Sequence, residues 1–180
     1  MDVEKIIRDK NIYFAKEVIA GIPCTVGYIK KFRWRWLATQ LNTFIIIGEI
    51  EGTIQPLMIR NFSKSCYQYA ISHNKGWPRG LQSGIGSIAI LIGAEMTQEA
   101  AAYCMGSPEV HYSAFEIPVA YLKKYRQSVK YTGTQLWGGI YYPYFNSLIN
   151  EFVGQLSLLQ ISQTPPSLPP LPGMSMEEGM

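Results

Sequence analysis

The stretch Ser87-Ile88-Ala89-Ile90-Leu91-Ile92-Gly93 decides the expected fold. Its five central residues are apolar, three of them are β-branched, and glycines stand at both ends of the run, at positions 86 and 93. A short apolar run of this kind favours a strand buried on both faces. A second run, Phe44-Ile45-Ile46-Ile47-Gly48-Glu49-Ile50, is also apolar on both faces at its start, as a central strand is. The sequence therefore predicts a sheet with a buried centre.

A segment with period two precedes the second run. In Lys31-Phe32-Arg33-Trp34-Arg35-Trp36 every even position is aromatic and every odd position is basic. This alternation predicts a strand with two opposed faces. We expect its aromatic side chains in the core and its arginine stems along the rim. Residues Asn42-Thr43 then connect it to the strand at 44–50 in an antiparallel hairpin.

Helices are expected where apolar residues recur every three or four positions, and four segments meet this condition: 2–20, 53–74, 97–104 and 144–160. Gly21-Ile22-Pro23 ends the first of them. Thr53 and Thr97 are the expected N-caps of the second and third. The last helix has the most regular apolar pattern and is expected to pack on the sheet.

Two further strands complete the expected order. The first covers about 110–122, where Pro118 indicates an edge or a bulge, and the second covers 128–131. The order α-β-β-α-β-α-β-β-α predicts an α+β fold, with an antiparallel or mixed sheet of about five strands and helices packed on it. We expect one domain over residues 1–161. Residues 162–180 are proline-rich, which favours a disordered tail that cannot build a core.

Composition excludes several protein classes. The chain is 47% hydrophobic and 16% charged, with a net charge of +3, which permits an anionic partner without requiring one. Its three cysteines form no C-x-x-C pair, so neither a disulfide framework nor a zinc site is expected. The longest apolar run, 85–94, is too short to span a bilayer, and the charged N-terminus has no apolar signal region. We expect a cytoplasmic protein without a membrane span, metal or cofactor.

The glycine-rich segment 76–86 is the first candidate site. It contains Trp77, Arg79, Gln82 and Ser83, and Lys75 precedes it. Its backbone can approach an anionic ligand closely, but it lacks the G-K-[S/T] sequence of a phosphate-binding loop and precedes a strand instead of following one. The simpler interpretation is a connection between a helix and a buried strand.

The second candidate is the aromatic segment 137–144, which runs from Trp137 through Gly138-Gly139 to the tyrosines 141, 142 and 144. Exposed aromatic residues beside a glycine-rich turn are typical of recognition surfaces, so Trp137 and Tyr141 are candidate contact residues. The alternative is that these rings pack the last helix on the sheet. The tail matches a loose P-x-x-P pattern and is either a docking peptide or a spacer.

The leading hypothesis is a binding module that uses the 75–84 loop and the 137–144 segment to contact a protein partner or an anionic ligand. The alternative is a small enzyme acting on an anionic or phosphorylated substrate, with Arg79, Gln82, Ser83 and Glu116 in one pocket. Glu116 lies between two apolar residues. It either faces solvent or is buried with a basic partner such as Arg79.

The sequence favours two other chemistries less. Lys31, Arg33 and Arg35 can follow a nucleic-acid backbone, but base stacking requires aromatic rings on the same exposed face, and these rings are expected in the core. Glu49, Glu51 and Glu116 can hold Mg²⁺ if they meet across the sheet. The spacing of these carboxylates is not specific, and the first two more simply mark the end of a strand.

Overall fold

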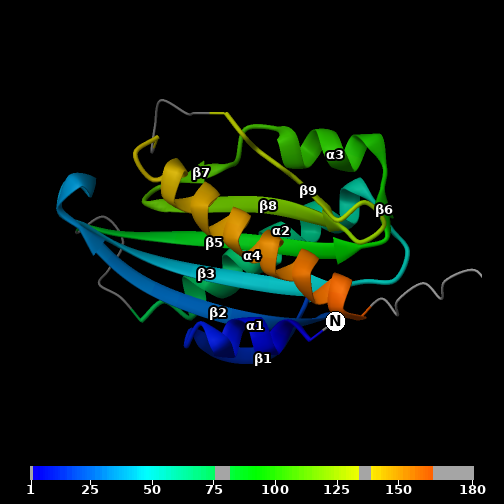
Figure 1. Ribbon diagram of the computed structural model, residues 1–180. Coiled ribbons are helices and arrows are strands. Elements are labelled where there is room, and N and C mark those ends of the chain that lie inside the picture. Colours follow the sequence, from blue (N-terminus) through cyan, green and yellow to red (C-terminus); the bar gives the residue numbers. More distant parts are fainter. Residues whose placement is uncertain (1, 76–81, 134–138, 164–180) are drawn as a thin grey trace, which may run out of the picture.

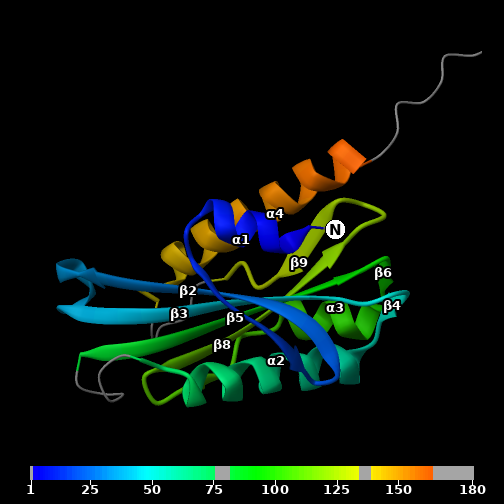
Figure 2. The same cartoon turned by 90° about the horizontal axis from the view of Figure 1, so that it is seen from below.

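One mixed sheet lies between two layers of helices in the computed structural model, which describes residues 2–75, 82–133 and 139–163 (Figures 1 and 2). The helices are α1 (Val3–Asp9), α2 (Pro56–Ser72), α3 (Gln98–Met105) and α4 (Tyr142–Gln163), with a 3₁₀ turn η1 (Trp34–Trp36). The strands are β1 (Tyr13–Ile19), β2 (Ile22–Arg33), β3 (Thr39–Glu49), β4 (Thr53–Ile54), β5 (Ser83–Gly93), β6 (Glu95–Met96), β7 (Val110–His111), β8 (Ala114–Leu122) and β9 (Gln127–Lys130).

The main sheet has the order β1-β2-β3-β5-β8-β7, and β9 also pairs with β8. Strands β1, β2 and β3 form an antiparallel meander, whereas β3, β5 and β8 are parallel to one another. Strands β7 and β9 run antiparallel to β8, and the short strands β4 and β6 form a separate parallel pair. The predicted α+β class with a mixed sheet is confirmed, and the sheet has seven strands instead of about five.

The centre of the sheet is buried on both faces, as the apolar runs indicate. Every residue of β5 and β8 is buried. Along β3, side chains alternate between the two hydrophobic clusters: Ile45 and Ile47 belong to one, and Phe44 and Ile46 to the other. Helices α1 and α4 cover the first face, and α2 and α3 cover the second (Figure 2).

The prediction of one helix over 2–20 is wrong. Helix α1 ends at Asp9, Asn11 follows with φ +54°, and strand β1 begins at Tyr13. The apolar spacing of Phe14 and Val18 fits a helix, but the segment 13–19 is rich in aromatic and β-branched residues, which favour a strand. Ala20 and Gly21 both have positive φ and form a two-residue hairpin turn, so this glycine ends a strand instead of a helix.

The expected antiparallel pairing of two strands is confirmed, but Asn42 and Thr43 do not connect them: both lie within β3, and the turn is at residues 34–38. The aromatic side chains of this hairpin do not all enter the core either. Strand β2 stops at Arg33, and η1 replaces the last strand residues. Only Trp36 of the three aromatics is buried, at 1% exposure. Phe32 is exposed although it still pairs with Gln40, and Trp34 is exposed beyond Arg33, where the strand pairing ends.

The remaining predictions are mostly confirmed at the level of elements. Thr97 caps α3, since its Oγ1 accepts a hydrogen bond from the N–H of Ala100 at 3.2 Å. Thr53 does not cap α2; it lies in β4, and the N-cap position is Gln55. Pro118 interrupts nothing, since β8 continues through it, but it lies between the stretches of β8 that pair with β7 and with β9. Helix α4 is longer than expected at both ends, and the proline-rich segment from 164 lies outside the described residues.

Candidate functional site

The structure describes only part of the expected loop site. Trp77, Arg79 and Trp137 lie outside the described residues. The Lys75 ammonium lies 4.9 Å from the centre of the Phe14 ring. Gln82 is exposed with φ +53°, and its carbonyl accepts a hydrogen bond from the N–H of Gln40 at 2.8 Å. The described ends of this segment thus contact residues of the sheet: Lys75 lies over Phe14 of β1, and Gln82 bonds to Gln40 of the interior strand β3.

Ser83 belongs to a buried hydrogen-bond network centred on Asn42. The Asn42 side chain is fully buried; its Oδ1 accepts from the Tyr28 hydroxyl at 2.8 Å and from Gln40 Nε2 at 3.3 Å, and its Nδ2 donates to Ser83 Oγ at 3.3 Å. These bonds join three neighbouring strands. Burying the amide is tolerable because its polar atoms are paired, so Ser83 has a structural explanation.

Ser83 and Glu116 are not in contact. Glu116 is the register partner of Ser87, which lies four positions along β5 from Ser83. At about 3.3 Å per residue, this is roughly 13 Å along the strand. The two residues share the α2 face of the sheet, but one pocket does not bring their side chains together.

Tyr141 lies at the base of the β2–β3 hairpin. Its ring is half-buried and packs edge-on against Trp36, at 5.5 Å between centroids, and against Phe115, at 5.4 Å. Tyr144 packs on the same Trp36 ring at 5.1 Å. The described part of the aromatic segment therefore packs around Trp36. This agrees with the alternative interpretation of the segment, in which its rings pack inside the protein instead of forming a contact surface.

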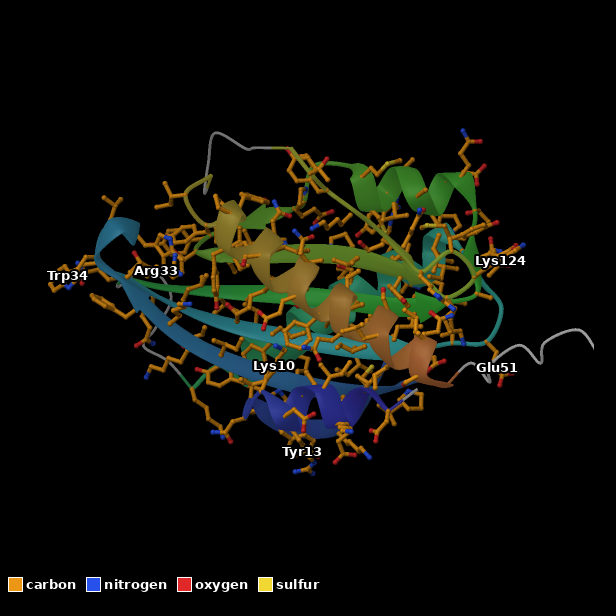
Figure 3. The ribbon with its side chains drawn as sticks, in the orientation of Figure 1. Lys10, Tyr13, Arg33, Trp34, Glu51 and Lys124 are labelled. Carbon is orange, nitrogen blue, oxygen red and sulfur yellow. The ribbon has the colours of Figure 1, made fainter. Side chains whose placement is uncertain are left out.

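Exposed apolar side chains gather instead where the hairpin ends, in residues 30–38, which we call the hairpin tip. Trp34 and Leu37 are each 81% exposed, and Phe32 is 50% exposed. The Phe32 and Trp34 rings meet edge to face at 5.4 Å. Figure 3 shows Trp34 projecting from the outer end of the hairpin, away from the sheet. Large apolar side chains that cluster at a protruding turn mark a contact surface.

The hairpin tip is also cationic. Lys30 is exposed, and the half-buried Lys31 and Arg33 lie beside aromatic rings. The Arg33 guanidinium lies 4.8 Å from the Trp36 ring centre, and the Lys31 ammonium lies 5.2 Å from that of Tyr144. The side chain of Arg35 lies outside the described residues. No acidic residue stands between Glu17 and Glu49, so the sequence around the tip contains no carboxylate to neutralise these charges.

A second polar cluster lies on the α2 face, at the β7–β8 turn. Glu116 is 3% exposed, and its Oε2 is 3.7 Å from His111 Nε2, which is also 3.9 Å from Glu109 Oε2. The ligand atoms of these three residues all lie within 4.8 Å of one another. The backbone holds the cluster together, since the N–H of Glu116 donates to the carbonyl of Glu109 at 3.2 Å. We call these three residues the Glu–His–Glu cluster.

Aromatic and polar side chains surround the Glu–His–Glu cluster. Tyr67 of α2 stacks on the His111 ring, with 4.3 Å between centroids and 26° between planes. Burial raises the pKa of Tyr103 of α3 to about 12, and the negative charge of Glu116 adds to this rise. Burial also raises the pKa of the Cys66 thiol, again with a contribution from Glu116. The buried carboxylate thus acts electrostatically on both helices that cover it.

Sequence reasoning selected Glu116 but neither of its partners. Glu109 and His111 lie seven and five positions before it in a stretch whose pattern predicts one strand. The strand folds back at Ser113, which has φ +50°, and this turn brings His111 opposite Ala114. A non-glycine residue with positive φ leaves little trace in a sequence. The other two candidate carboxylates are separate from this cluster: Glu49 pairs with Lys123 at 2.8 Å, and Glu51 is exposed.

Comparison with protein-family models, with curated proteins and with solved structures finds no match for this chain. Among the described residues, no helix is both long enough and apolar enough to cross a membrane.

Proposed function

We propose that this protein is a non-enzymatic binding module that docks peripherally on an anionic membrane surface through its hairpin tip. One observation carries the proposal: Trp34 and Leu37 are each 81% exposed, and the segment in which they lie, between Glu17 and Glu49, contains cations and no carboxylates. Apolar side chains flanked by Lys and Arg are the composition of protein surfaces that bind the headgroup region of anionic lipids.

The apolar part of the tip supplies the insertion energy. Burying a leucine-sized side chain contributes about 1.5–3 kcal/mol, and tryptophan suits the boundary between headgroups and acyl chains because its ring is apolar with one polar N–H. The tip is also supported from below, because Trp36 is buried and packs against Tyr141 and Tyr144. A fixed turn loses less conformational entropy on docking than a free loop does.

The charge of the tip selects the kind of surface. Each Lys or Arg close to an anionic leaflet contributes about 1 kcal/mol, and this attraction weakens with salt. Cys24, Cys66 and Cys104 are free and buried, which fits a reducing compartment. The proposal therefore includes a cytoplasmic location, with the anionic cytoplasmic leaflet as the partner.

Single-stranded nucleic acid is the competing partner, because Phe32 and Trp34 are exposed beside cations instead of buried. Stacking on bases uses ring faces and phosphate contacts, but it gives no role to an exposed Leu37. The edge-to-face contact between Phe32 and Trp34 also blocks part of the stacking surface. Lipid docking uses all three side chains and is therefore favoured.

The test is co-sedimentation of the full chain with vesicles of phosphatidylcholine alone or with 30% phosphatidylserine (about a third of the lipid). We expect binding to the anionic vesicles that weakens as salt rises from about 0.1 to 0.5 M. The double variant W34A/L37A should lose at least about tenfold in partition coefficient, because removing about 1.4 kcal/mol of insertion energy lowers an equilibrium constant tenfold.

The matched control is V18A, since Val18 is 70% exposed on the edge strand β1, at the other end of the hairpin from the tip. It should bind vesicles as the parent does. The proposal is overturned if the parent chain does not co-sediment with anionic vesicles. If the parent chain instead binds a single-stranded oligonucleotide in a salt-sensitive way, the hairpin tip is assigned to nucleic-acid binding.

A further inference from the structure

No hydrogen bond joins the side chains of the Glu–His–Glu cluster, whose two contacts lie at the long end of the ion-pair range. The distances from His111 Nε2 to the two glutamate oxygens, 3.7 and 3.9 Å, exceed the roughly 3.2 Å limit of an N–H···O hydrogen bond. His111 Nε2 is buried and makes no hydrogen bond among the described residues. The ring is held by stacking on Tyr67, so the nitrogen faces two carboxylates at an unbonded distance.

These distances suit three donors around one ion. Zinc bonds to imidazole nitrogen and carboxylate oxygen are about 2.0–2.2 Å long. At the tetrahedral angle usual for zinc, two such donors lie about 3.3–3.6 Å apart, so the measured distances of 3.7 and 3.9 Å are a few tenths of an ångström longer than a zinc site requires. Glu109, whose side chain is 70% exposed, can adjust its rotamer to close the remaining gap.

The burial of the Glu116 carboxylate is a second reason to expect a cation at the cluster. Glu116 lies inside the layer between the sheet and α2, where an uncompensated carboxylate is costly. Beside it on the same face stands its register partner Ser87, whose fully buried hydroxyl has no hydrogen-bond partner among the described residues. A cation at the cluster would compensate the negative charge of Glu116. A water molecule bound to that cation would give the Ser87 hydroxyl a hydrogen-bond partner.

We propose that Glu109, His111 and Glu116 bind a divalent transition-metal ion of the zinc class. One imidazole with two carboxylates favours Zn²⁺ or Mn²⁺ over Mg²⁺ and Ca²⁺, which prefer oxygen ligands alone. Three protein ligands leave at least one coordination position for water, and the exposed Glu109 gives this position access to solvent. The site does not depend on the hairpin tip and goes beyond the proposed membrane docking.

The experiment titrates the metal-free full chain with Zn²⁺. Calorimetry measures the stoichiometry and affinity of binding, and thermal unfolding measures the melting temperature with and without Zn²⁺. We expect one ion per chain and a rise in the melting temperature with Zn²⁺. E116Q keeps the shape of the side chain but removes its charge. It should weaken Zn²⁺ affinity at least about tenfold, the scale on which altered ligand shells act. Without metal, E116Q should melt at a higher temperature than the parent, because it removes a buried charge that no hydrogen bond compensates among the described residues.

The matched control is H73A, because His73 also stacks on a tyrosine of α2, Tyr69, at 4.0 Å, and has no place in the cluster. It should bind Zn²⁺ as the parent does, whereas H111A should not. Substitution with Co²⁺ adds a readout independent of stability, since its visible absorption should appear in the parent and vanish in H111A. Equal Zn²⁺ binding by the parent and E116Q, or no stoichiometric binding by the parent, overturns the proposal.

Discussion

At the scale of single residues, close packing requires glycine at some positions of the sheet, because a larger side chain would collide with a neighbour. Gly86 lies at the start of β5, beneath α4. A Cβ built on it would lie 2.5 Å from a ring carbon of Phe145, which is itself 1% exposed and cannot move toward solvent. Gly154 lies on the exposed side of α4, and a Cβ there meets nothing within 4 Å. The same residue type therefore has opposite roles at two positions.

We expect G86A to lower the free energy of unfolding by about 1–3 kcal/mol, the usual cost of overpacking a core. G154A should raise it by about 0.5–1 kcal/mol, because alanine restricts the unfolded chain and suits a helix better than glycine does. Urea denaturation of both variants measures these changes. A G86A chain as stable as the parent would mean that α4 does not pack on this part of β5.

At the scale of elements, the apolar pattern predicted the strands at the sheet centre and the last helix, because burial dictates their residues. It failed for residues 2–20, where Phe14 and Val18 fit both a helical stripe and one side of a short strand. The candidate sites were harder to predict than the fold. The hairpin tip depends on where β2 stops pairing, and the Glu–His–Glu cluster on a turn at Ser113; neither follows from local residue preference.

Helix capping gives a prediction at this scale with a control from the sequence itself. Thr97 accepts the N–H of Ala100 and starts α3, whereas Thr53 is exposed in β4 and caps nothing. T97A should therefore cost about 0.5–2 kcal/mol of stability, and T53A less than about 0.5 kcal/mol. Thermal unfolding of the two variants measures the difference. Equal losses would contradict the assigned cap.

At the scale of the whole molecule, burial controls the alkaline limit of stability. It raises the pKa of Cys24 from 9.0 to about 11 and that of Cys104 to about 12. Above pH 9 the unfolded chain has lost these protons while the folded chain still holds them. The unfolded state then binds fewer protons, so the free energy of unfolding falls as pH rises.

We expect the urea midpoint, measured in reducing buffer, to be steady between about pH 7 and 8 and to fall between pH 9 and 11, in the window that these two pKa values set. The double variant C24A/C104A should show a shallower fall over the same window, even though the lost packing lowers its stability at pH 7. A parent midpoint that stays constant up to pH 11 would contradict the burial of these thiols.

The parallel pairing of β3 with β5 also has a consequence for folding kinetics. The strands β1, β2 and β3 pair with neighbours in sequence, but each pair between β3 and β5 spans the whole of α2. Contacts between distant segments form slowly, because a long loop must close first. During synthesis the meander therefore emerges with the apolar edge of β3 uncovered, and the chain depends on the arrival of β5 to protect it from aggregation.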